Sequence, residues 1–210
     1  MSAALSPRSN AKPETWPAEN RAAYAHLLGA YLGNGRISNR GSTPGLHLDR
    51  DINHPGIIEE CASSIENVVA GRIDSHRHPH TNCLRLTCHN VLWPVLFPQP
   101  GPDRKPGHEI ELVGWQQEIV NVFPEKFLRG LIHSDGSDRQ NTFTVHLKGG
   151  AREYACPRYF FTNPSEGIRK VFTDTCDQLE VRWTVSNRRE ISISDRDSVA
   201  FLDTFIGPKF

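Results

Sequence analysis

Hydrophobic and polar residues follow the same order twice along this chain of 210 residues. In each copy, a stretch with apolar residues at helical spacing precedes two strand-like stretches, a second helical stretch, two more strands and a short helix. The sequence therefore predicts an α+β fold, internally duplicated as two α-β-β-α-β-β-α halves. Helices are expected at 22–32, 55–69, 90–97, 124–133, 165–179 and 197–205, and strands at 36–38, 45–50, 72–76, 83–88, 142–147, 157–162, 181–186 and 190–194.

Composition divides the chain into four segments. Residues 1–19, rich in Ala, Ser, Pro and Asn, are expected to form a flexible tail, and residues 20–97 the first half. Pro and Gly open the segment 98–123, which is expected to be a stiff linker with a connecting helix, and 124–210 form the second half. No apolar run is long enough to span a bilayer, and the five cysteines form no CxxC pair. We therefore expect a cytoplasmic monomer with pseudo-twofold symmetry and reduced thiols.

The first helix of each half ends in a similar motif, LLGAYLGNG at 27–35 and LRGLIHSDG at 128–136. Each motif has two small residues four positions apart, which share one face of a helix. Two such faces can pack with their backbones closer than the usual ~8–10 Å between helix axes. Each motif also closes on a glycine, which is expected to take a left-handed conformation just past the helix. The expected interface residues are Gly29, Gly33, Gly130 and Ser134.

The residues at the ends of these two helices, Asn34 and Asp135, are expected to converge between the halves. A carboxylate at the C-terminal end of a helix is unfavourable beside the helix dipole unless a cation compensates it. A hard divalent cation with oxygen ligands is suited to this role. The alternative is that Asn34 and Asp135, each followed by glycine, only end the helices.

The second motif resembles that of the LAGLIDADG homing-endonuclease superfamily, and the first motif resembles it more weakly. The order of helices and strands in both halves, and the phrase Tyr159-Phe160-Phe161 before a helix, are also similar to single-chain bacterial members. The resemblance covers roughly residues 20–210. The matching positions are Leu128, Gly130, Leu131, Ile132, Asp135 and Gly136 in the second motif and Leu27, Gly29 and Gly35 in the first.

This resemblance implies that the motif helices join the halves and that two antiparallel sheets form a saddle over the major groove of double-stranded DNA. It implies that Asp135 binds Mg²⁺, with Asn34 at the matching position of the first half, for hydrolysis of a phosphodiester bond. Asn34 departs from the usual aspartate, because an amide oxygen can bind a metal but brings no charge. Arg188 or Arg189, in the turn between the last two strands, is expected to stabilise charge at the scissile phosphate.

The charge of the chain is balanced, with 24 basic and 24 acidic residues, which is unusual for a DNA-binding protein. The distribution is uneven, because the segments 36–50, 72–89, 138–163 and 181–194 hold thirteen basic and five acidic residues. Positive charge on these segments would neutralise phosphates, while Arg, Asn and Gln side chains would read base edges. The alternative is that these arginines are ordinary solvated surface. The predicted DNA contacts are Arg36, Arg40, Arg77, Arg85, Arg139, Lys148, Arg158, Arg182 and Arg189.

Three functions fit these patterns. The first is a Mg²⁺-dependent DNA endonuclease, for which Asn34 favours weak or nicking activity. The second is a non-cleaving transcriptional regulator on the same fold, and the third is an RNA-splicing maturase. A zinc site is a further alternative, although no CxxC pair completes it. Its ligands would come from His76, His78, His80, Cys83, Cys88 and His89.

Overall fold

The computed structural model describes residues 12–39, 41–99, 110–147 and 150–207, with the backbone alone for 138–147 and 150–157. After a short 3-10 helix, η1 (Pro13–Thr15), the first half follows the predicted order of elements. Its strands form one antiparallel sheet in the order β1-β2-β4-β3. The elements are α1 (Ala18–Asn34), β1 (Gly35–Ser38), β2 (Gly45–Asp51), α2 (Pro55–Val68), β3 (Ile73–Arg77), β4 (Cys83–His89) and α3 (Trp93–Leu96).

The second half repeats this arrangement after a connecting helix, α4 (Gly114–Val122). Its sheet has the equivalent order β5-β6-β8-β7 and is also antiparallel. The predicted α+β fold with two duplicated halves and two antiparallel sheets is therefore confirmed. The elements are α5 (Pro124–Asp135), β5 (Gly136–Leu147), β6 (Gly150–Thr162), α6 (Glu166–Gln178), β7 (Thr184–Asn187), β8 (Glu190–Ile193) and α7 (Arg196–Asp203).

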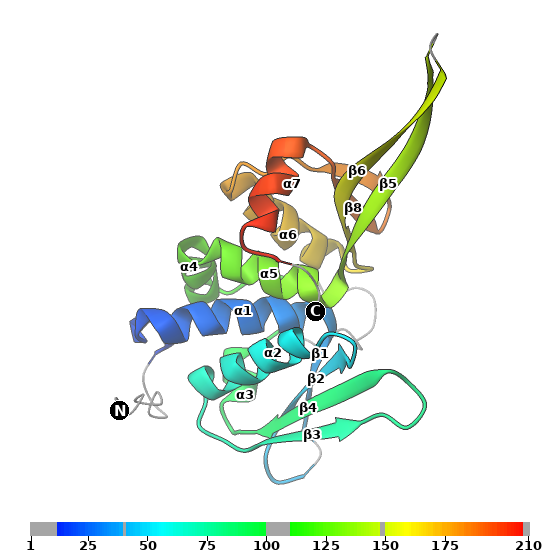
Figure 1. Ribbon diagram of the computed structural model, residues 1–210. Coiled ribbons are helices and arrows are strands. Elements are labelled where there is room, and N and C mark those ends of the chain that lie inside the picture. The colour runs from blue at the N-terminus through cyan, green and yellow to red at the C-terminus, as the bar shows by residue number, and fades with distance from the viewer. Residues whose placement is uncertain (1–11, 40, 100–109, 148–149, 208–210) are drawn as a thin grey trace, which may run out of the picture.

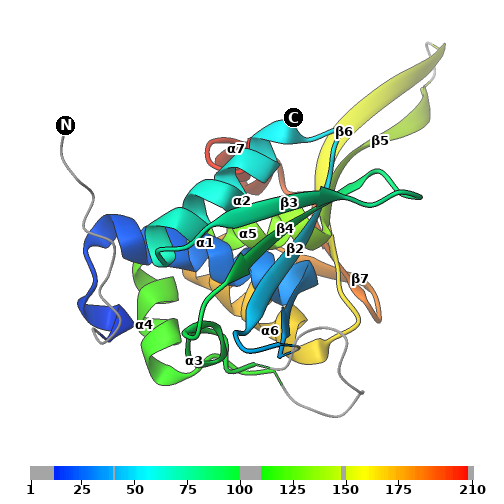
Figure 2. The same cartoon turned by 90° about the horizontal axis from the view of Figure 1, so that it is seen from below.

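The helices α1 and α5 lie side by side at the centre of the molecule, and each sheet belongs to one half (Figure 1). In this view the first sheet lies below α1 and the second lies at the upper right, so the two sheets diverge, and Figure 2 shows the same pairing of α1 and α5 from below. In each sheet one face carries core residues and packs against the helices, and the other face points away from them. None of the described helices is both long and apolar enough to cross a membrane.

A continuous apolar core joins the halves through α1 and α4. Tyr24 of α1 stacks on Phe97 with 5.6 Å between ring centroids and contacts Trp115 of α4 at 5.3 Å. Gln116 of α4 is fully buried and donates a hydrogen bond of 2.7 Å to the Tyr24 hydroxyl. Trp16, before α1, is also buried and packs edge-on against Tyr24. The connecting helix is therefore part of the core, because its buried amide is satisfied inside it.

Three local expectations were wrong: β6 begins at Gly150 rather than at 157, and the other two concern the chain just after the motif helices. Gly35 and Gly136 have φ values of −83° and −88°, so neither is left-handed. Each glycine instead starts a strand directly, and each is needed for space: a Cβ on Gly136 would lie 2.6 Å from the Ile132 carbonyl oxygen. Consequently β5 begins at Gly136 rather than at 142, where polar residues had hidden the strand pattern.

Candidate nucleic-acid interface and motif-helix site

The motif helices contact each other backbone to backbone through their small residues. A Cβ on Gly29 would lie 2.3 Å from the Phe127 carbonyl oxygen, and one on Gly130 would lie 2.2 Å from that of His26. Further along, a Cβ on Gly33 would lie 2.3 Å from the Ser134 Cβ. No larger side chain fits at these glycines while the helices keep this separation. The close approach brings the C-terminal ends of α1 and α5 together.

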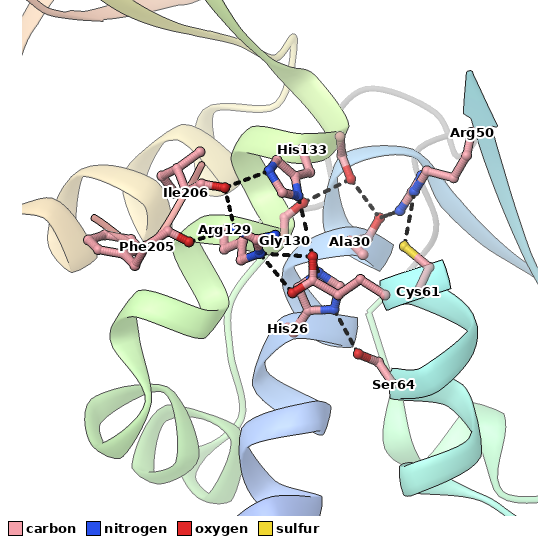
Figure 3. A network of polar contacts seen from close by, with 12 residues as sticks. His26, Ala30, Arg50, Cys61, Ser64, Arg129, Gly130, His133, Phe205 and Ile206 are labelled. Carbon is pink, nitrogen blue, oxygen red and sulfur yellow. Dashed lines mark hydrogen bonds and ion pairs between the residues drawn. The ribbon is translucent and has the colours of Figure 1, made fainter. Parts of the chain in front are cut away.

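At the end of α1, the Asn34 side chain is held by a buried arginine. The guanidinium of Arg50 donates a hydrogen bond from Nη1 to the Asn34 Oδ1. Its Nη2 lies 3.3 Å from the carbonyl oxygen of Ala30 in the last turn of α1, and its Nε lies 3.3 Å from Cys61 Sγ (Figure 3). Arg50 is 4% exposed. A fixed positive charge therefore sits at the negative end of the α1 dipole, the position expected for a cation.

At the end of α5, the Asp135 carboxylate meets a buried amide. Asn163 is 3% exposed and donates a hydrogen bond from Nδ2 to Asp135 Oδ2 at 2.5 Å. The carboxylate also lies against α1, since a Cβ on Gly33 would be 3.4 Å from the Asp135 Cγ. Asp135 and Asn34 thus lie close to the contact between the two motif helices.

Arg50 and Asn163 occupy equivalent positions in the two halves. In the strand register, Gly35 pairs with Leu48 and Gly136 pairs with Phe161. Arg50 lies two positions after Leu48, and Asn163 lies two positions after Phe161. Sequence reasoning missed both residues and counted Arg50 as part of a basic surface. The alternation Leu46-Leu48-Arg50 was the available signal, because residues two apart in a strand share one face and Leu46 and Leu48 are core residues.

The two motif ends differ in whether they suit a divalent cation such as Mg²⁺. In the second half Asp135 supplies an anionic oxygen, which such an ion prefers. In the first half the ligand oxygen of Asn34 is neutral and is already bound by the Arg50 guanidinium. A second cation beside this buried guanidinium would be repelled by it. The first half therefore does not fit a metal, and Arg50 supplies the compensating charge.

The outward face of the first sheet carries Arg36 and Arg85. Arg36 pairs with His47 in the register, and its Nε is buried without a hydrogen-bond partner among the described residues. Arg85 is instead bound by Asp49, with Nε and Nη2 lying 2.7 and 2.8 Å from the two carboxylate oxygens. These hydrogen bonds hold the pKa of the Asp49 carboxyl below its usual value. Arg77 is exposed but pairs with Leu84, which places it on the opposite face of the strand.

The second sheet carries Arg158 and the exposed turn between β7 and β8. Arg158 lies opposite Arg139 in the register, and its Nε is also buried without a partner in the described part of the chain. Arg188 and Arg189 are exposed in the turn. The Arg189 carbonyl oxygen accepts a hydrogen bond of 2.9 Å from the backbone N–H of Asn163, so the turn lies next to the Asp135 site.

The other predicted contacts are placed less favourably or not at all. Arg182 is exposed but forms an ion pair of 3.0 Å with Asp195, before α7. Arg40 and Lys148 lie outside the described residues, as does the side chain of Arg139. Among the residues that the structure describes, no three of the His and Cys residues near the β3–β4 hairpin bring their ligand atoms together. The thiols of Cys61, Cys83, Cys88 and Cys176 are free.

By sequence, no family model and no curated protein matches the chain. By structure, it is similar to the N-terminal LAGLIDADG domain of DUF199/WhiA (TM-score 0.54, 11% identity, covering 94% of this chain and 87% of that one). It is also similar to the homing endonuclease I-DmoI, solved in complex with DNA and Mn (TM-score 0.56, 16% identity, 91% and 99%). The chain has the LAGLIDADG fold.

The likeness extends to full-length DUF199/WhiA from Thermatoga maritima (TM-score 0.58, 12% identity). It covers 93% of this chain, which spans 58% of that longer protein. The LAGLIDADG resemblance inferred from the two motifs is thus confirmed as a shared fold. At identities of 11–16%, the activity must be argued from this chain's own residues.

Proposed function

We propose that this chain binds double-stranded DNA across the outward faces of its two sheets and holds it without metal-dependent cleavage. The fold supports binding, because the similar I-DmoI structure is a complex with DNA. Its two sheets, related by the pseudo-twofold arrangement of the halves, suit a duplex whose two strands are themselves related by twofold symmetry.

The observation that carries the binding proposal is the state of two arginines on these faces. The Nε donors of Arg36 and Arg158 are buried and lack a hydrogen-bond acceptor among the described residues. A buried donor without an acceptor is costly, and a movement of the side chain that exposes it would let a phosphate oxygen accept a charge-assisted hydrogen bond from it. The two arginines come from different halves, so a duplex that spans both sheets would engage both.

The guanidinium of Arg50 favours holding DNA over cutting it. Metal-dependent hydrolysis on this fold was expected to use a cation at the end of each motif helix, and one of these ends is bound by Arg50. Cleavage with Mg²⁺ is the second candidate function, and the Asp135 carboxylate beside the exposed arginines of the β7–β8 turn is the feature that favours it. Arg188 or Arg189 would then stabilise charge at the scissile phosphate.

Selection from a randomised duplex pool tests the proposal. Purified protein is expected to enrich a defined sequence in EDTA, and fluorescence anisotropy on that duplex then measures affinity against salt. Arg36→Gln and Arg158→Gln should each weaken binding and lower the slope of log K against log salt by about 0.9. Lys170→Gln is the matched control, because Lys170 lies on α6 and pairs with Asp174. Unchanged slopes in both arginine variants, or preferential binding of structured RNA, would refute the proposal.

A further inference from the structure

Three side chains that bind metals in other proteins converge where α1, α2 and α5 meet. His26, Glu60 and His133 each offer one ligand atom, and these atoms all lie within 4.8 Å of one another. Glu60 Oε2 is 3.7 Å from His26 Nε2 and 3.7 Å from His133 Nδ1. Figure 3 shows the two imidazole rings close together, one from each motif helix. The cluster therefore spans both halves of the fold.

The second nitrogen of each imidazole is already bound to an oxygen. His26 Nδ1 lies 2.8 Å from Ser64 Oγ, and His133 Nε2 lies 3.1 Å from the carbonyl oxygen of Ile206 (Figure 3). A carbonyl oxygen can only accept, so His133 Nε2 carries the hydrogen, and in the neutral ring Nδ1 then has a lone pair directed toward Glu60. His26 Nε2 is buried and has no hydrogen-bond partner in the described part of the chain. Metal-binding histidines commonly use their second nitrogen in this way.

His26 Nε2 and the Glu60 carboxylate face each other without a hydrogen bond. The distance from Nε2 to Oε2 is 3.7 Å, which is too long for one. In the tautomer whose Nδ1 donates to Ser64, Nε2 has a lone pair, and this lone pair and the carboxylate oxygen repel each other unless a cation lies between them.

Arg129 fixes the carboxylate of this cluster in place. Its Nε lies 2.7 and 2.8 Å from the two oxygens of Glu60, and its Nη1 donates to the carbonyl oxygens of Phe205 and Ile206. A hydrogen-bonded carboxylate is typical of metal sites, where the surrounding groups orient the ligands. The positive charge of Arg129 opposes a second cation, so it limits the affinity of the site. Glu60 is 24% exposed, which leaves access from solvent.

We propose that His26, Glu60 and His133 form a site for a transition-metal ion such as Zn²⁺, which links the two halves of the fold. Two histidines and one glutamate leave a fourth position of a tetrahedral ion for water. Bonds of about 2.0–2.2 Å to such an ion place its ligand atoms about 3.4 Å apart. The two distances to Glu60 Oε2 are 3.7 Å, so they need shifts of a few tenths of an ångström, and the two histidine nitrogens, which lie within 4.8 Å of each other, must also approach to this distance. Imidazole ligands favour Zn²⁺ over Mg²⁺, which distinguishes this site from the Asp135 carboxylate.

Equilibrium dialysis of the full chain against Zn²⁺, after treatment with EDTA and in excess Mg²⁺, tests the proposal. One equivalent of bound Zn²⁺ is expected, and Co²⁺ in its place should give the visible absorption of a four- or five-coordinate ion with nitrogen ligands. Neither measurement needs a variant. Less than one equivalent of Zn²⁺, or a Co²⁺ spectrum of the hexaaqua type, would overturn the proposal and leave the cluster as a polar contact between the halves.

Variants then assign the ligands. Glu60→Gln and His133→Gln should each weaken Zn²⁺ binding by about tenfold or more, as the loss of groups at metal sites does. The control replaces His76, His78 and His80 of the exposed hairpin with Asn, and should leave the binding unchanged. Circular dichroism in EDTA shows whether each variant is folded. Binding that survives Glu60→Gln but disappears in the hairpin variant would assign the metal to the hairpin and refute this site.

Discussion

The two halves of the molecule share their scaffold and differ in their chemistry. Both motif helices use small residues for a backbone-to-backbone contact, and both end directly in a strand. At the end of α1, however, Asn34 is bound by the buried cation of Arg50, whereas at the end of α5 Asp135 is bound by the neutral amide of Asn163. The comparison shows that a duplicated fold can keep its interface while each half evolves a separate environment for the group at its centre.

The largest effect is expected where the halves are alike. Gly29→Ala and Gly130→Ala each place a Cβ within 2.3 Å of a carbonyl oxygen of the opposite helix. Each should lower the free energy of unfolding by about 3 kcal/mol or more, because neither helix can move without disturbing the core. Urea denaturation measures the change. Gly114→Ala is the control, since a Cβ there meets nothing within 4 Å; equal stability of all three variants would contradict the close packing.

The second prediction concerns pH and a residue that only the first half has. His26 of α1 corresponds to Phe127 of α5, because the two motifs are offset in the same way. His26 lies four residues before Ala30, and Phe127 lies four residues before Leu131. Its pKa falls from an ordinary 6.5 to about 3, owing to burial and then to Arg50, Arg129 and Lys126, while Glu60 faces it from α2. Between these values the unfolded chain binds the additional proton, so stability falls as pH decreases from about 6.5 toward 3.

The expected slope from this histidine is at most about 1.4 kcal/mol per pH unit. Urea denaturation at pH 4, 5, 6 and 7 measures it in the wild type and in His26→Gln, which keeps a polar group near Ser64. The variant should show a correspondingly flatter dependence over this range. The same slope in both proteins would mean that His26 is not held neutral.

A third prediction transfers the second half's pair of residues into the first. Asn34→Asp combined with Arg50→Asn gives both motif helices an aspartate bound by an asparagine. We expect this double variant to bind Mg²⁺ or Mn²⁺ about tenfold more tightly than the wild type, a change of about 1.4 kcal/mol. Asn34→Asp alone should not, because Arg50 would then bind the new carboxylate. Titration calorimetry distinguishes these outcomes, and equal affinities in all three proteins would refute the role given to Arg50.

The smallest effect is the expected difference in DNA affinity between variants of two arginines on one sheet. Arg36 has an unsatisfied Nε, whereas the guanidinium of Arg85 is already bound by Asp49. Arg36→Gln should therefore weaken DNA binding by about tenfold, within the ~1–2 kcal/mol of one charge-assisted contact, and Arg85→Gln by less. Anisotropy with the selected duplex gives both values. A larger loss for Arg85→Gln would show that its ion pair opens on DNA.

The pattern of apolar residues predicted the duplicated fold because it reports which face of each element is buried. It placed Gly29, Gly33, Gly130 and Ser134 at one helix contact for the same reason. It missed the beginning of β5, where the polar run from Ser137 to Asn141 carries no alternation. It also could not identify Arg50 as a buried residue, because charged residues are rarely buried and are counted as surface by default.

The residues that bind Asn34 and Asp135 at the ends of the motif helices are far from them in the sequence. Asn34 and Arg50 lie on different elements, as do Asp135 and Asn163, and only the register of β2 and β6 brings each pair together. His26, Glu60 and His133 are likewise separated along the chain and meet only when α1, α2 and α5 pack. Sequence spacing alone carries no signal for such pairs.

The most direct test of DNA binding without cleavage is a cleavage assay on the selected duplex, with Mg²⁺ and with EDTA. We predict that the wild type binds this duplex with the same affinity in both conditions and that both strands stay intact in Mg²⁺. Strand breaks that need Mg²⁺ and disappear in Asp135→Asn would contradict it, and would show that the Asp135 half cuts DNA in spite of the guanidinium in the other half.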